Sequence, residues 1–312
     1  MGDKGTFWLP EGASTLASEI DWLFNFVHIV SLILFIGVVG GIILFAFKYR
    51  RRRADEVPVP VTESKFLEMA WIIVPTILVL VLFNWGFQTF IKIQVAPPDS
   101  YEINVIARKW LWEFQYPDGT TSTNELHVPA NRPVRLVMQS EDVIHSLFVP
   151  AFRIKQDVLP NRYTAVWFET TRAGEFQLFC TEYCGTQHSG MLAKVVAHPQ
   201  GEFEQWLESA GGDDDLPLPE LGARLYEQQV CKTCHSIDGS RVIGPTFKGL
   251  FGSTRQLEGG GTAVADEDYL LEAIVEPSAK VTAGYPNAMP PSYAGLSARQ
   301  LDALIAFIKE QQ

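Results

Sequence analysis

Two long apolar runs stand out in the first third of the sequence. Residues 23–47 and 69–91 carry no formal charge, and each run is long enough, at about 1.5 Å per residue, to cross a hydrocarbon core of roughly 30 Å. A basic cluster, 48–53, opens the connecting segment 48–65. Two buried helices of a large soluble core are the alternative. Adjacent runs closed by such a cluster instead favour a transmembrane hairpin with its connecting segment in the cytoplasm and both chain ends outside.

After a stiff, proline-containing connector at 96–99, the pattern of apolar residues changes to a period of two. Apolar and aromatic residues then alternate with other residues along two stretches, Tyr101, Ile103, Val105 and Ala107, and Trp110, Trp112, Phe114 and Tyr116. Further short strands are predicted at 134–138, 163–169, 175–180 and 193–197. Short strands at this spacing predict a β-sandwich or barrel of about 100 residues.

The last third of the chain reads as helical. A short amphipathic stretch, 202–209, leads to 211–217, where glycines, like charges and prolines predict a flexible, solvated linker. Near the C-terminus Ser297 and Gln300 match a capping box and precede an apolar helical face. The predicted parts are a hairpin segment, a β domain, a linker and a helical domain, at 1–95, 96–199, 200–218 and 219–312.

Composition narrows the possible functions. Charged residues make up 20% of the 312 residues and hydrophobic residues 47%, which excludes a largely disordered chain. A net charge of −11 argues against a nucleic-acid partner, because phosphate binding needs basic patches. Six histidines and four cysteines are present, so any metal site draws on few residues.

The densest cluster of metal-binding residue types lies between two predicted strands. Cys180, Cys184, His188 and Met191 fall within twelve residues, and the last three match the loop spacing of a blue-copper protein. His145 is the best candidate for a second imidazole, and a second thiolate allows two copper ions to be bridged. A disulfide between the two cysteines and a tetrahedral zinc site are the alternatives.

A second motif lies in the predicted helical domain. Cys231, Cys234 and His235 form the C-x-x-C-H signature of c-type haem attachment, in which two thiols bond to the haem and the histidine binds the iron. A zinc or thioredoxin-like site is the alternative. Histidine is absent after His235, and Met289 is the only methionine after Met191, so Met289 is the predicted sixth ligand. Histidine–methionine ligation raises the reduction potential of such a haem.

The copper-type loop, together with Asp-Val-Ile-His-Ser at 142–146, resembles the binuclear copper A centre of cytochrome oxidase subunit II. The resemblance covers residues from about 20 to 200. It implies a cupredoxin fold and a copper-ligand set of His145, Cys180, Glu182 (through its backbone carbonyl), Cys184, His188 and Met191. It also implies that the Glu182 side chain helps to hold a magnesium ion shared with subunit I.

Two further positions are similar to this family. Trp110 matches the aromatic patch where electrons enter, although the usual second aromatic is Leu111 here. Without the resemblance, Trp110 and Trp112 are equally well explained as strand packing. Glu68, before the second apolar run, matches a glutamate at the mouth of a proton-uptake channel, and a solvated helix cap is the alternative.

Residues 219–312 resemble a class I cytochrome c, so the chain is similar to subunit II of a caa-type oxidase. This resemblance implies a multi-pass protein of the bacterial inner membrane with both redox domains on the periplasmic side. Electrons would pass from an external cytochrome or other small redox protein to haem c, to copper A, and then to an oxygen-reducing, proton-pumping subunit I. Subunit III and the lipid bilayer are further expected partners.

Two other kinds of protein would have some of the same sequence motifs. A membrane-tethered copper-binding or copper-delivery module needs copper ligands but neither Glu182 nor Glu68, and it leaves the haem motif unexplained. A nitrous oxide reductase-like enzyme shares the copper centre but lacks the hairpin.

Overall fold

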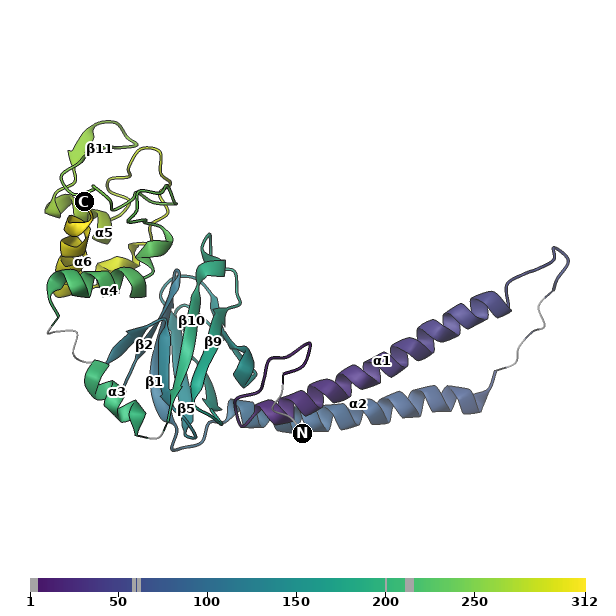
Figure 1. Cartoon of the computed structure of the whole chain (residues 1–312). Coiled ribbons are helices and arrows are strands. Elements are labelled where there is room, and N and C mark those ends of the chain that lie inside the picture. The colour runs from purple at the N-terminus through teal and green to yellow at the C-terminus, as the bar shows by residue number, and fades with distance from the viewer. Residues whose placement is uncertain (1–4, 58–59, 61–62, 200, 211–215) are drawn as a thin grey trace.

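The computed structural model describes the chain except residues 1–4, 58–59, 61–62, 200 and 211–215. A long helical hairpin, a β-sandwich and a small, mainly helical C-terminal domain follow one another (Figure 1). The hairpin and the C-terminal domain lie on opposite sides of the sandwich (Figure 1). Residues 101–198 form the sandwich domain, and residues 218–312 form the C-terminal domain.

The hairpin consists of α1 (Ala17–Lys48) and α2 (Lys65–Gln94). Both helices are long and apolar enough to cross a membrane. The side chain of Ser64 caps α2 by accepting a hydrogen bond from the Leu67 amide, 3.4 Å away. Pro75 lies inside α2, a position that membrane helices tolerate when neighbouring groups satisfy the freed backbone.

Polar contacts join the outer end of the hairpin to the sandwich domain. Glu19 of α1 accepts a hydrogen bond from Lys92 of α2 at 2.7 Å, and the Lys92 carbonyl accepts one from the indole of Trp167 at 2.9 Å. The guanidinium of Arg153 binds Asp21 through two nitrogens, at 2.7 and 2.9 Å. Bidentate pairs of this kind fix orientation as well as distance, so the sandwich domain is held in one orientation on the hairpin.

The sandwich domain is built from two sheets of five strands each. In spatial order, the first sheet contains β3 (Thr121–Thr123), β2 (Leu111–Gln115), β1 (Tyr101–Arg108), β5 (Pro133–Ser140) and β8 (Thr164–Glu169). The second contains β4 (Glu125–Pro129), β10 (Leu192–His198), β9 (Gly174–Cys180), β6 (His145–Val149) and β7 (Ile154–Val158). The pair β1–β5 is parallel, with Tyr101 opposite Val134, and the alternating apolar residues of both sheets meet in one buried core.

The C-terminal domain contains α4 (Leu218–Gln228), α5 (Glu267–Val275) and α6 (Ala298–Glu310). The predicted capping box is confirmed, because Ser297 and Gln300 each bond the other's backbone at the start of α6. The expected helical domain is confirmed, with one small addition. A short antiparallel hairpin, β11 (Thr254–Gln256) and β12 (Thr262–Val264), joins the haem-motif region to α5. Its three-residue strands are too short to show a clear alternation in sequence.

Helix α3 (Glu202–Ala210) covers a histidine pair at the edge of the second sheet. His127 and His198 share a hydrogen bond of 2.8 Å between Nδ1 and Nε2, and Trp206 stacks on His127 with ring centroids 4.0 Å apart. Burial and the neighbouring His198 lower the pKa of His127 from 6.5 to about 4, although Glu125 opposes this. Lys194 lies near the same pair and adds to the lowering.

Stability should therefore depend on pH through His127. Between pH 4 and 6.5 the unfolded chain binds a proton that folded His127 rejects, so stability falls as pH decreases through this window. A pKa of about 4 in place of 6.5 corresponds to about 3 kcal/mol of unfolding free energy lost at pH 4. His127→Phe, which keeps the stack on Trp206, should flatten this pH dependence in chemical denaturation of the full chain. An unchanged slope would contradict the assignment to His127.

Candidate functional site

The cysteine loop between β9 and β10 brings the predicted copper ligands together. The ligand atoms of His145, Cys180 and Cys184 all lie within 4.8 Å of one another. Cys180 and Cys184 are 3.9 Å apart between sulfurs, far beyond a disulfide bond, and both are free thiols. The disulfide alternative is therefore not supported by the structure.

Three further donor atoms complete this cluster. His188 Nδ1 lies 3.4 Å from the Cys184 sulfur, and the Met191 sulfur lies 3.8 Å from the same atom. The carbonyl oxygen of Glu182 lies 3.4 Å from the Cys180 sulfur. Together with His145 this gives four donors around the two thiols, six donors in all. Six exceeds the four that a structural zinc ion uses and would suit a site for two copper ions.

Hydrogen bonds orient these donors toward one another. His145 is fully buried, its Nε2 bonds Asp142 at 2.8 Å and its Nδ1 faces the Cys180 sulfur at 3.8 Å. Burial lowers the pKa of His145, but the hydrogen bonds to Asp142 and Cys180 outweigh it and raise the value overall. A hydrogen bond from the Cys184 thiol lowers the pKa of Cys180, which favours a thiolate. Asp142 thus orients the imidazole with Nδ1 toward the thiols.

Trp110 lies directly against the cysteine loop, outside strand β2. Its indole nitrogen donates to the Cys184 carbonyl at 3.2 Å. Gly185 has a φ of +116°, and a Cβ at this position would come within 3.2 Å of the Trp110 ring. The backbone conformation therefore favours glycine here, and any larger residue would also press on the indole.

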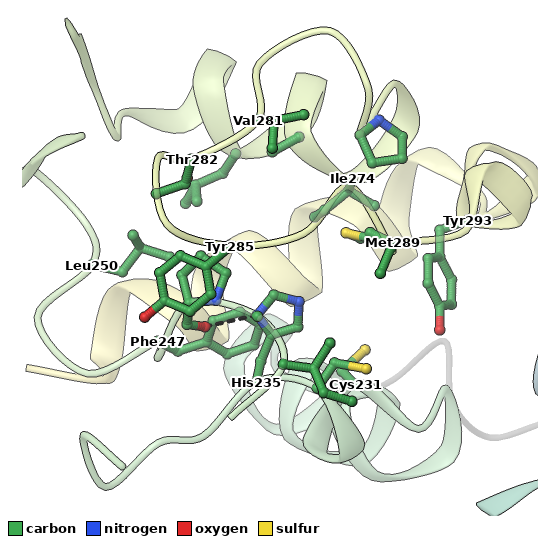
Figure 2. A pocket seen from close by; sticks show the side chains of 18 of the residues that line it. Cys231, His235, Phe247, Leu250, Ile274, Val281, Thr282, Tyr285, Met289 and Tyr293 are labelled. Atoms are coloured by element: carbon green, nitrogen blue, oxygen red, sulfur yellow. Dashed lines mark hydrogen bonds between the residues drawn. The ribbon is translucent and has the colours of Figure 1, made fainter. Parts of the chain in front are cut away.

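The haem motif lines an apolar cavity of the C-terminal domain. Cys231, Cys234 and His235 face it, as does Met289, and its empty volume is about 1210 Å³ including its open side. Figure 2 shows His235 and Met289 on different sides of the cavity. Burial raises the pKa of the Cys231 thiol to about 12 and also raises the pKa of Cys234. Two neutral thiols that line an apolar cavity suit covalent attachment to a flat, apolar group.

The orientation of His235 also fits an iron ligand. Its Nδ1 donates to the Pro245 carbonyl at 2.7 Å, which leaves Nε2 free to bind a metal. Burial lowers the pKa of His235, so the imidazole is held neutral as metal binding requires. At Gly244, a Cβ would lie 2.6 Å from the imidazole, so only glycine lets the ring take this position.

Glu68 is separate from both sites. It lies in the first turn of α2, half-buried, and its amide bonds the Ser64 carbonyl at 3.0 Å. The side chain that caps this helix belongs to Ser64.

Asp142 is a residue of the copper-type site that the sequence interpretation missed. Its only signal is a carboxylate three residues before His145.

Comparisons with known proteins cover nearly the whole chain. Three protein-family models match the sequence. The family "Cytochrome C oxidase subunit II, transmembrane domain" matches residues 3–89, and the family "Cytochrome C oxidase subunit II, periplasmic domain" matches residues 120–198. The family "Cytochrome c" matches residues 219–312.

Individual relatives agree with these matches. Cytochrome c oxidase subunit 2 of Alkalihalophilus pseudofirmus is 28% identical over 93% of this chain and 87% of its own length. That of Synechocystis is 28% identical over 64% of this chain and 74% of its own length. The solved periplasmic domain of subunit II from Bradyrhizobium japonicum is 29% identical, covering 38% of this chain and 97% of that one with a TM-score of 0.36. The chain therefore belongs to the cytochrome c oxidase subunit II family, in a form that carries a cytochrome c domain at its C-terminal end.

Proposed function

We propose that this chain takes electrons from an external donor at its C-terminal domain and delivers them through its sandwich domain to subunit I of a terminal oxidase. The observation that carries the proposal is that two separate donor sets, one around two thiols and one around a haem-type cavity, occur in one membrane-anchored chain. When bound, binuclear copper A and haem c each supply reversible one-electron transfer. The chain's own residues hold, orient and shield these groups.

Each group has a proposed set of residues. The copper ligands are His145, Cys180, Cys184, His188 and Met191, with the backbone carbonyl of Glu182 as a sixth donor. Cys231 and Cys234 form the covalent attachment, His235 is the proximal ligand and Met289 the distal one. The Glu182 side chain is exposed in the isolated chain, as a residue that holds magnesium jointly with subunit I must be.

The chain is proposed to lie in a bacterial inner membrane. The basic cluster of the segment 48–65 favours the cytoplasmic side, which puts the sandwich and C-terminal domains in the periplasm. Residues 58–59 and 61–62 of this segment lie outside the described part of the chain. Subunit I, subunit III and a cytochrome or other small redox protein are the proposed partners.

Co-purification tests this function against a copper-delivery module. The full chain, tagged at its C-terminus, would be purified from detergent-solubilised membranes of its own host. Recovery of a large membrane partner that contains haem and copper supports the oxidase. A chain that carries copper but purifies without any haem-copper partner would favour the delivery module.

The distal ligand can be tested directly. Met289→Ala should remove the long-wavelength sulfur-to-iron absorption band and lower the reduction potential of the C-terminal domain, because histidine–methionine ligation raises it. Redox titration of the purified full chain measures both effects. A band that survives the substitution would show that another group binds the iron. Tyr285→Phe, in the same cavity, is the control that should keep the band.

Glu68 is proposed to collect protons at the cytoplasmic end of α2. A carboxylate at a helix end reaches water with little desolvation cost and can pass protons inward. Glu68→Gln should slow reduction of the haems in subunit I while reduction of copper A stays fast, in stopped-flow experiments on the intact complex. Glu63→Gln, just before the same helix, is the matched control. Unchanged turnover would leave Glu68 as a solvated residue of the first turn.

A further inference from the structure

Leu111 is buried although it points away from the core of its own domain. The alternation along β2 sends Trp112 and Phe114 into the sandwich and Leu111 to the opposite face. An isolated sandwich would expose such a leucine to solvent. Leu111 is nevertheless only 1% exposed, and it belongs to the apolar cluster formed by the C-terminal domain. The C-terminal domain therefore covers this face of β2.

Asn124 provides a rigid polar contact beside Leu111. Its φ of +58° is a left-handed conformation that asparagine tolerates better than most residues. Its side-chain oxygen accepts from the Trp112 amide at 2.9 Å, and its own amide donates to the Trp112 carbonyl at 2.8 Å. The remaining side-chain nitrogen donates to the carbonyl of Gln228, in the C-terminal domain, at 3.2 Å. Asn124 is thus fixed within the sandwich and presents one donor to the other domain.

A second polar contact joins the neighbouring residues Thr123 and Gln229. The Gln229 side chain donates to the Thr123 hydroxyl at 3.4 Å. The Gln229 carbonyl in turn accepts from the Tyr293 hydroxyl at 3.0 Å, and Tyr293 lines the haem-type cavity. The end of α4 is therefore held from both sides, by the sandwich domain and by the wall of the cavity.

These contacts lie beside both candidate redox sites. On one side, Gln228 and Gln229 are within three residues of Cys231. On the other, Leu111 is flanked by Trp110, whose indole bonds the Cys184 carbonyl, and by Trp112, whose ring packs edge-on against His145 with centroids 6.1 Å apart. The two motifs are thus linked by a short series of packed and hydrogen-bonded residues.

We propose that Leu111, Thr123 and Asn124 form a built-in docking face for the chain's own C-terminal domain, and that Leu111 is the positioning residue that sets the distance between the two redox sites. This inference rests on the proposed function and adds the surface through which the two domains work together. It also gives a physical role to an aliphatic residue at an otherwise aromatic patch. A leucine fits into an apolar cluster, where it can be fully covered.

Hydrogen exchange of the intact complex, with no added cytochrome, tests the docking. Peptides covering 108–115 and 226–234 should be protected in the unchanged protein. Leu111→Lys should raise exchange in both by about tenfold or more, since full burial of a leucine side chain corresponds to at least that factor. Leu271→Lys, at an exposed leucine of α5, is the matched control and should change neither. If the first peptide becomes protected only after a free cytochrome is added, the face belongs to an external partner and the proposal is wrong.

A kinetic measurement separates this proposal from the proposed function. After rapid photoreduction of the C-terminal domain in the same complex, Leu111→Lys should slow transfer to copper A by about tenfold or more while reduction by the external donor keeps its rate. Leu111→Met, which preserves an apolar contact, should restore most of the transfer rate. Unchanged copper absorption in each variant shows that the sandwich domain is folded. Unaltered transfer in Leu111→Lys would overturn the docking role alone, whereas a C-terminal domain that never accepts electrons first would overturn the proposed function.

Discussion

Replacing Cys184 by serine should remove the copper centre and reduce oxygen consumption by the complex at least about 100-fold, since even residues outside the ligand set change metal sites by 10- to 100-fold. The Cys184 sulfur is one of the two central atoms of the cluster. It lies 3.9 Å from the Cys180 sulfur, 3.4 Å from His188 Nδ1 and 3.8 Å from the Met191 sulfur. A serine hydroxyl neither bridges two copper ions as a thiolate does nor offers a soft donor.

Two measurements check this expectation. Elemental analysis of the purified complex should show two fewer copper ions per chain, and the purple absorption of the centre should disappear. Thr186→Ser, at an exposed position of the same loop, is the matched control and should leave both unchanged. Retention of the purple absorption in Cys184→Ser would show that Cys184 is not a bridging ligand.

The metal-binding residues could be predicted from the sequence because they are scarce and chemically distinctive. With four cysteines and six histidines in the chain, the spacing of Cys180, Cys184, His188 and Met191 leaves little freedom. Asp142 could not be identified in the same way, because a single carboxylate is common on any surface. Its role depends on the turn before β6, which brings it within 2.8 Å of His145 Nε2.

The strands were predicted where alternation was clear. The stretches at 134–138, 163–169, 175–180 and 193–197 are confirmed as β5, β8, β9 and β10, to within two residues at each end. Strands β3, β4, β6 and β7 were missed, because each has at most five residues and offers little alternation of its own. Sequence patterns report which side of a strand is apolar, but not which neighbouring element covers it.

Leu111 shows this limit most clearly. In the sequence it is an outward-facing residue at a patch where an aromatic is usual, which suggests weaker recruitment of a mobile cytochrome. The structure shows that the same residue is covered by the chain's own C-terminal domain. That contact joins positions more than one hundred residues apart, through Asn124 and Gln228, and local patterning carries no signal for it.

Removing the C-terminal domain should sharply reduce turnover with the natural donor while copper A and assembly with subunit I remain. The short tether, 211–217, gives the attached domain an effective concentration of order mM. Its loss therefore turns a fast step within one chain into a slower encounter between two proteins. We expect a decrease of at least about tenfold at micromolar donor, since effective concentration then exceeds the free concentration by far more than that. The linker, 211–217, is expected to be a flexible coil, and residues 211–215 lie outside the described part of the chain.

The truncation after Ala210 requires its own control, because it uncovers Leu111. A second truncation that also carries Leu111→Gln restores a polar surface, and both versions should keep full oxygen reduction with small-molecule reductants that reach copper A. Added free cytochrome c should restore only part of the rate with the natural donor, since it lacks the tether. Stopped-flow reduction of the intact complex should show the haem of the C-terminal domain reduced before copper A. If copper A is reduced first, or if the truncated complex keeps full activity with its native donor, the C-terminal domain is an accessory rather than the point where electrons enter.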